Sequence, residues 1–205
     1  MAQTIAISDY VSQAPGFVLN LPPWEACSKA ADIIETQFAG LSTSYKMIER
    51  GIAVHHTATV EPSAILKAPC VIGANCFIAA FVYLRGGVWL DSNVTVGPSA
   101  EVKSSFVFGG SSVAHLNFVG NSVIGRNVNI EAGVVLANYR NERDAKEIIC
   151  FDGRQYIHTG HEKFGSLIGD GCRIGANAVL APGTVLAHGA VVERLALIDQ
   201  SADAI

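Results

Sequence analysis

The chain has 205 residues and a formal net charge of −4, enough for one well-buried domain with a small appendage but not for two independent enzymes. Half of the residues are hydrophobic and 16% are charged, yet the most apolar stretch, residues 76–84, is far shorter than the roughly 20 residues of a membrane-spanning helix. Because lysine and arginine form no dense cluster, we expect neither a membrane nor nucleic acid as a partner.

The first residues, MAQTIAISDY, place no basic residue before an apolar run, so we predict no secretory signal and a cytoplasmic location. The five cysteines are odd in number and form no Cys-x-x-Cys pair, which argues against a disulfide framework and against a zinc site. We interpret the cysteines as packing residues and expect no metal.

Residues 1–51 precede the regular part of the sequence and are predicted to form an N-terminal extension. After Pro22 and Pro23, apolar residues recur at alternating steps of three and four, which is typical of an amphipathic helix over residues 24–39. A second short helix is predicted over residues 44–50. We expect these helices to cap the first layer of the structure that follows, which would otherwise leave strand edges open to solvent.

Aliphatic residues recur every six positions from Val54 onward, with two shorter steps and one interruption, and such a period fixes the fold. The series comprises Val54, Val60, Leu66, Ile72, Ile78, Leu84, Leu90, Val96, Val102, Val107, Val113, Val119, Ile124, Ile130, Leu136, Ile168, Ile174, Leu180, Leu186 and Val192. Four residues after many of them stands a small or β-branched residue, and three of the five cysteines occupy this position. We predict an all-β fold of stacked parallel coils over residues 52–196.

This period of six, with aliphatic, small and turn-forming residues, resembles the hexapeptide repeat of the hexapeptide acyltransferases. The resemblance implies a left-handed parallel β-helix in which three hexads make one triangular coil. The hand comes from the resemblance, because the spacing alone does not fix it.

Two segments leave the repeat. Residues 139–166 carry charges and turn residues, and we interpret them as a loop ejected from one coil, a type of segment that is usually functional. We predict that this loop closes over the active site or reaches a neighbouring subunit. Residues 197–205 are predicted to form a C-terminal tail.

Arg85 and Lys103 are 18 residues apart, and each directly follows an aliphatic residue of the series. Residues one coil apart lie above each other at the strand spacing of about 4.8 Å, so both cations are predicted to project from one face. Two stacked cations repel each other, and a dianion such as a phosphate would bridge them. The alternative is a pair of solvated surface cations.

Polar residues are expected close to these cations. Counting hexads onward places Asn138 above them on the same face, and His115 on the preceding face. Asn129 closes the hexad before the one stacked over His115. One polar cluster around a single corner is therefore predicted, with His115 as a catalytic rather than a purely structural histidine.

A more specific resemblance covers residues 84–192. Its motifs are Ala114-His115-Leu116-Asn117-Phe118-Val119-Gly120, Ile124-Gly125-Arg126-Asn127-Val128-Asn129-Ile130, Ala132-Gly133 and Asn138-Tyr139. They resemble the acetyltransferase domain of the bifunctional sugar-1-phosphate nucleotidylyltransferase/acetyltransferases, which make UDP-N-acetylglucosamine. The inserted segment around residues 159–170 is most similar to the archaeal-type branch. The nucleotidylyltransferase half is not found in this sequence, so we do not expect the chain to make the nucleotide sugar by itself.

The resemblance assigns roles to individual residues. His115 matches the catalytic base. The matches to substrate ligands are Arg85, Lys103, Asn129, Asn138, Tyr139 and Lys163. Phe118 stands where the family commonly has a substrate-contacting tyrosine, and Ala176 replaces a serine near the coenzyme site. Ala176 and Arg194, where the last coils end, are the candidates for contacting the cofactor.

The implied reaction is N-acetylation by acetyl-CoA of an amino-sugar 1-phosphate similar to glucosamine 1-phosphate, or of a related sugar nucleotide. A neutral imidazole can remove the proton that prevents an ammonium from attacking a thioester. The family also implies a homotrimer with sites between subunits. The alternative from another class is a non-catalytic trimeric module that binds the sugar phosphate but has lost coenzyme binding. A carbonic anhydrase of the same fold is disfavoured, because the six histidines lack its paired spacing around zinc.

Overall fold

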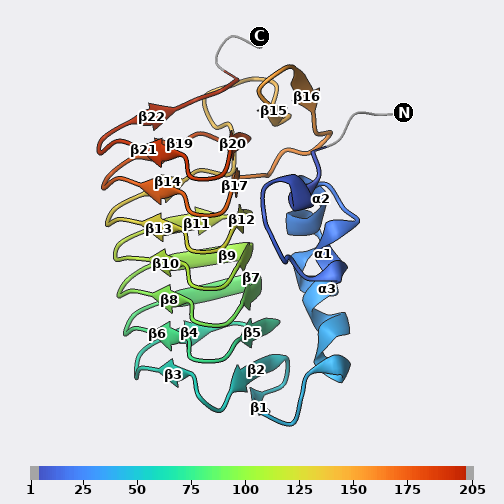
Figure 1. Cartoon of the computed structure of the whole chain (residues 1–205), viewed down its shortest axis with the longest axis vertical. Helices are drawn as coiled ribbons and strands as arrows, with labels where there is room; N and C mark the ends of the chain where they lie inside the picture. The colour runs from blue at the N-terminus through green and yellow to red at the C-terminus, as the bar shows by residue number, and fades with distance from the viewer. Residues whose placement is uncertain (1–4, 202–205) are drawn as a thin grey trace.

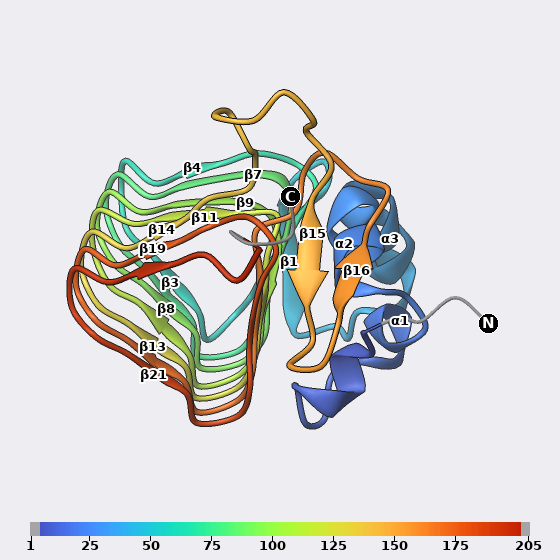
Figure 2. The ribbon, with the colours of Figure 1, turned by 90° about the horizontal axis from the view of Figure 1, so that it is seen from above.

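The computed structural model describes residues 5–201, and these form a stack of parallel coils with one flank covered by helices (Figure 1). Seen along the stack, each coil is triangular (Figure 2). One 7-stranded parallel sheet makes the first face, and a 13-stranded sheet bends around a corner to make the other two. The predicted left-handed parallel β-helix with a short helical N-terminal part and an ejected loop is confirmed.

We name the three faces by what lies on them. The groove face consists of β3 (Thr59–Val60), β6 (Phe77–Ile78), β8 (Thr95–Val96), β10 (Ser112–Val113), β13 (Asn129–Ile130), β18 (Arg173–Ile174) and β21 (Val191–Val192). The cation face consists of β4 (Ile65–Leu66), the first halves of β7 (Tyr83–Leu90) and β9 (Glu101–Val107), β11 (Phe118–Gly120), β14 (Val135–Leu136), β19 (Val179–Leu180) and β22 (Leu197–Ile198). The covered face consists of β2 (Ile52–His55), β5 (Cys70–Ile72), the second halves of β7 and β9, β12 (Val123–Ile124), β17 (Ser166–Ile168) and β20 (Thr184–Leu186).

The aliphatic series fills the interior of the coils. On the covered face Val54 pairs with Ile72, Ile72 with Leu90, and Leu90 with Val107, and a register shift between Arg85 and Val88 takes up the five-residue step of the series. Cys70, Cys76 and Cys172 are buried among these side chains as predicted. Burial of this continuous column of apolar side chains is the main stabilising contribution to the stack.

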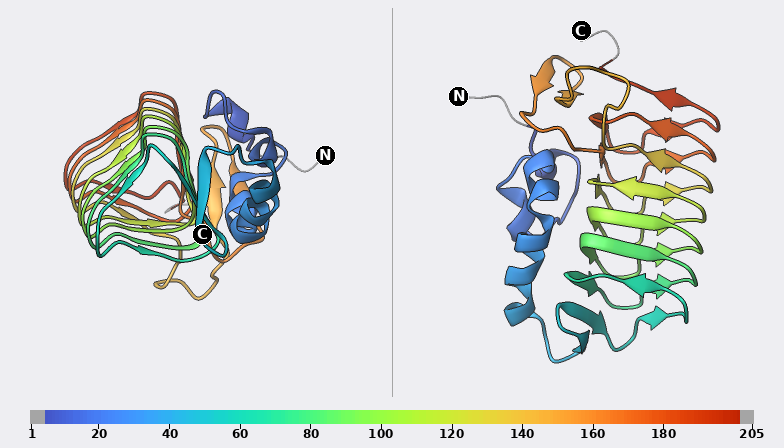
Figure 3. Two further views of the ribbon diagram at one scale, coloured as in Figure 1. Left: turned by 90° about the horizontal axis from the view of Figure 1, so that it is seen from below. Right: turned by 180° about the vertical axis from the view of Figure 1, so that it is seen from behind.

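Short helices run along the covered face (Figure 3). They are η1 (Ile7–Asp9), α1 (Gly16–Leu19), α2 (Pro23–Ser28), α3 (Ala30–Gln37) and η2 (Phe38–Gly40). The helix predicted over residues 24–39 is thus interrupted at Lys29 between α2 and α3. Gly87 has a φ of +90°, and a Cβ atom there would lie 2.5 Å from the Ala31 nitrogen. Glycine therefore allows α3 to approach β7 this closely.

The predicted capping by helices is wrong in two respects. Residues 44–50 form a strand, β1 (Tyr45–Glu49), which pairs antiparallel with β2. This strand, not a helix, covers the backbone edge of the first coil on that face, because an edge strand binds a further strand through its free N–H and C=O groups. The helices pack instead against the outward apolar side chains of the covered face, among them Phe106 and Val71.

The ejected segment is more ordered than a simple loop. It contains an antiparallel hairpin of β15 (Ile149–Phe151) and β16 (Tyr156–His158), and it returns to the stack at β17. Ile148, Cys150 and Ile157 are buried in the same apolar cluster as the N-terminal helices. The hairpin therefore lies beside the helices and helps to bury the covered face (Figure 2).

Two further observations concern the ends and the helices. Strand β22 lies within the predicted tail of residues 197–205 and pairs with β19, so the stack extends at least two residues further than predicted. The remainder of that tail from residue 202 lies outside the described residues. Between residues 5 and 201, no helix has the length and apolar character needed to cross a membrane.

Candidate active site

A hollow of about 430 Å³ lies at the end of the cation face, beside the ejected loop. It is lined by Arg85, Lys103, Phe118, Asn138, Tyr139, Glu162 and Lys163. Six of these seven residues were predicted from the sequence as substrate ligands. The fold therefore brings together cations from two coils, aromatic and amide side chains from the next coils, and a lysine from the returning loop.

The stacking of the two cations follows directly from the register. Arg85 in β7 is the register partner of Lys103 in β9, and each follows an inward aliphatic residue, as the 18-residue spacing predicts. Arg85 also forms an ion pair with Glu101, whose Oε1 lies 2.6 Å from an Arg85 terminal nitrogen and accepts from Nε at 2.7 Å. This contact fixes the guanidinium at one wall of the hollow.

The hollow has a surplus of positive charge around Lys103. Burial lowers the pKa of the Lys103 ammonium from its ordinary value, and the charges of Lys163 and Arg85 lower it further, while Glu101 opposes this. Charged forms crowded in this way are stabilised when an anion binds between them. The geometry is therefore that of an anion site open to solvent.

Close packing at Gly120 shapes the floor of the hollow. A Cβ atom at this position would lie 2.8 Å from the Phe118 ring and 2.8 Å from the Asn138 carboxamide carbon, so only glycine leaves room for both side chains. The Asn138 amide donates a hydrogen bond of 2.6 Å to the Asn121 side-chain oxygen. This hydrogen bond orients Asn138 before any ligand binds, with the Phe118 ring beside it over Gly120.

The loop delivers Lys163 to the hollow through its neighbour Phe164. The Phe164 ring is fully buried and lies 6.2 Å, centroid to centroid, from the Trp24 ring of α2. The Phe164 backbone N–H donates to the Asn138 carbonyl at 3.2 Å. Lys163 is thus tied on one side to the helical cover and on the other to the strand end that carries Asn138.

His115 lies at a different corner, where the chain turns from β10 to β11, and it is exposed. Backbone hydrogen bonds stack its position below Ala132, then Ala176, then Arg194 in successive coils. The proposed base and the two proposed cofactor residues therefore form one column. Phe118, the first residue of β11, follows His115 by three residues around this corner, and His115 is not among the residues that line the hollow.

Asn129 is not part of the hollow. It lies on the groove face, in a second depression of about 480 Å³ that also holds Glu131, Arg173 and Arg194. Glu131 accepts two hydrogen bonds of 2.8 Å from Arg194 and a third of 2.8 Å from the Ala176 N–H. The residues predicted to form one polar cluster therefore lie in separate places. Asn129 is on the groove face, whereas Arg85, Lys103 and Asn138 are in the hollow, with a corner of the coil between the two faces.

Two acidic residues near the hollow were not predicted from the sequence, Glu162 and Glu101. Glu162 directly precedes the predicted ligand Lys163. Glu101 occupies an outward position of the repeat, one coil beyond Tyr83, and this position was the signal that could have found it. Among residues 5–201, no group of three or more His, Cys, Asp or Glu side chains is arranged to hold a metal ion.

The fold and the repeat define the class: this is a hexapeptide-repeat protein with a left-handed β-helix. The family described as GMPPB C-terminal domain matches residues 48–140, and the hexapeptide repeat of succinyl-transferase matches residues 167–193. These matches confirm the repeat that was read from the sequence.

Named relatives narrow the class. The bifunctional sugar-1-phosphate nucleotidylyltransferase/acetyltransferase of Sulfurisphaera tokodaii is 39% identical over 105 residues, which are 48% of this chain and 26% of the relative. The bifunctional protein GlmU of Methanococcus maripaludis is 29% identical over 181 residues, 87% of this chain and 43% of the relative. The resemblance stated from the sequence is thereby confirmed. The chain spans less than half of the length of either relative.

Two solved structures align with the chain at low identity. The polysialic acid O-acetyltransferase OatWY aligns with a TM-score of 0.48 and 14% identity, covering 73% of this chain and 76% of its own. AntD, an N-acyltransferase from Bacillus cereus in complex with dTDP and 3-hydroxybutyryl-CoA, aligns with a TM-score of 0.36 and 17% identity, covering 73% and 70%.

Proposed function

We propose that this protein transfers an acetyl group from acetyl-CoA to the amine of an amino-sugar 1-phosphate. The observation that carries the proposal is the hollow in which Arg85, Lys103 and Lys163 converge beside Asn138. Three cations stand against two carboxylates there, Glu101, which is paired with Arg85, and Glu162; the remaining positive charge suits a phosphate, and the amide and aromatic side chains suit a sugar ring. The relatives named as sugar-1-phosphate acetyltransferases support this choice of substrate class.

In the proposed reaction, the phosphate binds at the cations and the sugar extends along β11 toward His115. The amine nitrogen forms a bond to the thioester carbonyl carbon and the carbon–sulfur bond breaks. The imidazole takes the proton that the amine loses, and a proton passes to the departing thiolate. Anchoring the phosphate orients the amine, and such positioning supplies several kcal/mol of the barrier reduction, on the order of 5 kcal/mol.

The cofactor candidates support a path for acetyl-CoA along the His115 column. Ala176 and Arg194 lie two and three coils above His115, or about 10 and 14 Å away at the strand spacing. A coenzyme lying along this corner would present its thioester end to His115. These cofactor contacts and the cytoplasmic location stay predictions.

A homotrimer is part of the proposal, and the corner beside His115 supports it. Phe81, Leu116 and Leu195 lie along it, 67%, 68% and 78% exposed, with Ser99 between the first two and Gly133 and Asn177 between the last two. All three have positive φ angles, which are unusual for large apolar side chains, and such exposed side chains along one corner suit contacts with another subunit. Sedimentation should show a trimer, and Leu116→Asp should weaken it. A monomer at micromolar concentration would contradict this part of the proposal.

The alternative is a sugar-phosphate-binding module without catalysis. The hollow is lined by residues of one chain, whereas His115 and the cofactor candidates lie outside it, on the corner before β11 and its stacked equivalents. Calorimetric titration separates the two functions. An enzyme should bind both acetyl-CoA and glucosamine 1-phosphate and release free thiol when both are present, whereas the module should bind only the sugar phosphate. Absence of sugar-phosphate binding would reject both.

A further inference from the structure

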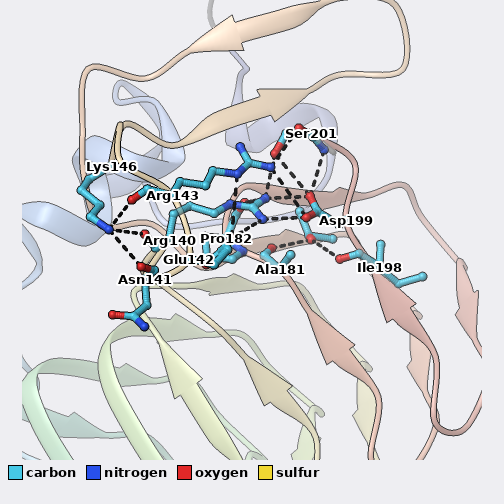
Figure 4. Close-up of polar contacts among 11 residues, drawn as sticks. Arg140, Asn141, Glu142, Arg143, Lys146, Ala181, Pro182, Ile198, Asp199 and Ser201 are labelled. Atoms are coloured by element: carbon cyan, nitrogen blue, oxygen red, sulfur yellow. Dashed lines mark hydrogen bonds and ion pairs between the residues drawn. The ribbon is translucent and has the colours of Figure 1, made fainter. Parts of the chain in front are cut away.

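Arg140 is the largest side chain buried between residues 5 and 201, and it lies outside the hollow (Figure 4). Only 2% of the residue is exposed. Its two terminal nitrogens donate to the two carboxylate oxygens of Asp199, at 2.7 Å each. One of them also donates to the Ser201 hydroxyl at 2.7 Å and to the Pro182 carbonyl at 2.9 Å.

These contacts join distant parts of the chain. Arg140 is the second residue of the ejected loop, and Asp199 is 59 residues further on, just after the last strand of the cation face. The pair therefore fastens the start of the loop to the end of the stack. The pair holds its partners firmly, because loss of Asp199 would leave the buried Arg140 guanidinium with the exposed Glu142 carboxylate, at 3.3 Å, in place of a bidentate partner.

The Arg140–Asp199 pair lies next to the wall of the hollow. Arg140 is adjacent to Tyr139, which lines it. Lys146 donates to the carbonyl oxygens of Arg140 and Asn141 at 3.1 and 3.0 Å and also to that of Arg143. Its ammonium lies 5.4 Å from the Tyr139 ring centre. Lys146 thus closes the first turn of the loop and places its ammonium near the ring of Tyr139, which is 37% exposed.

We propose that Arg140, held by Asp199, is a positioning residue that fixes Tyr139 and the first turn of the loop against the substrate hollow. The inference rests on the proposed function and adds to it a residue outside the site on which substrate affinity depends. The bond from Arg140 lowers the pKa of the Asp199 carboxyl, so its contribution to stability is complete above the ordinary value of 3.8 and is lost only as the pH falls below it. The Arg140–Asp199 ion pair is therefore present throughout the neutral pH range.

The test compares Arg140→Met with Arg126→Met in the full chain. Arg126 is a matched control, since it also pairs with an aspartate, Asp91, at 3.2 Å, but at a corner away from the hollow. We expect Arg140→Met to raise the KM for glucosamine 1-phosphate about tenfold while kcat changes by less than about threefold, because the substrate is less well held but the base is unaffected. Hydrogen exchange should become faster over residues 139–147. Arg126→Met should change neither readout.

Several outcomes overturn the inference. Unchanged exchange in Arg140→Met would show that the pair does not hold the loop, and faster exchange with an unchanged KM would show that the loop does not position the substrate. If Arg140→Met does not fold, Asp199→Asn, which keeps the side-chain volume and removes the charge, takes its place with the same expected results. If the wild type neither binds nor acetylates glucosamine 1-phosphate, the proposed function fails, and the exchange result alone decides whether Arg140 holds the loop.

Discussion

The covered face and the cation face are built from the same repeat but differ in what lies over their outward side chains. On the covered face these are apolar, including Val71, Phe106 and Leu167, and the N-terminal helices and the hairpin bury them. On the cation face the outward positions are half-buried or exposed, and the cations Arg85 and Lys103 follow two of them; these positions are Ile65, Tyr83, Glu101, Phe118, Val135, Val179 and Leu197.

The inward residues of the two faces are alike, because both fill the same triangular interior. The difference teaches that the repeat supplies the scaffold, while the segments outside the repeat decide which face is covered and which stays open to ligands. Substitutions on the covered face should therefore affect stability, and those on the cation face and its corners should affect ligands or rates.

The largest expected effect is on catalysis. His115→Ala should lower kcat by roughly 10²–10⁴ while the KM for the sugar phosphate changes little, because the phosphate is bound elsewhere. Since the side chain is exposed, the melting temperature should stay the same. Near-normal turnover by His115→Ala would reject the assignment of the base.

Two phenylalanines in outward positions test the comparison directly. Phe106 on the covered face is fully buried, so Phe106→Ala should reduce the free energy of unfolding by about 3–5 kcal/mol. Phe118 on the cation face is only partly buried, so Phe118→Ala should cost much less stability but weaken sugar-phosphate binding. Denaturant unfolding and calorimetry measure the two effects. Equal losses of stability would show that the faces do not differ as described.

A smaller effect is expected at Lys103. Lys103→Met should raise the KM for the sugar phosphate by about 10–100-fold, the value of a lost charged hydrogen bond. It should not lower the melting temperature, because the pKa of Lys103 is lowered in the folded protein and its charged form is therefore disfavoured there. The sign is that this penalty is complete below the folded pKa and is absent above the ordinary value of 10.5. A clear fall in melting temperature at neutral pH would contradict the crowding of cations.

The smallest effect is expected at the groove-face corner. Arg194 is 72% exposed even though it pairs with Glu131, so Arg194→Ala should leave stability unchanged. If the cofactor lies along the His115 column, the Kd for acetyl-CoA should rise by about fivefold or less, a change of about 1 kcal/mol. The Kd for glucosamine 1-phosphate should not change. Loss of sugar-phosphate binding in Arg194→Ala would instead show that Arg194 contributes to the sugar-phosphate site, contrary to its position outside the hollow.

The sequence by itself determined the scaffold and part of the hollow. A period of six must place its aliphatic residues inside a coil, so the interior, the packing of the cysteines and the stacking of Arg85 on Lys103 could be predicted. Lys163 was predicted from a family motif and not from its spacing, because the loop that carries it has no repeat.

Only the tertiary structure decided which surfaces are covered and which residues meet. Residues 44–50 became a strand because β2 offered a free edge, and Arg140 found its partner 59 residues away. The separation of His115 and Asn129 from the hollow has the same origin. Spacing along the chain fixes the inward or outward direction of a side chain, but its distance from another outward side chain depends on the corners that lie between them.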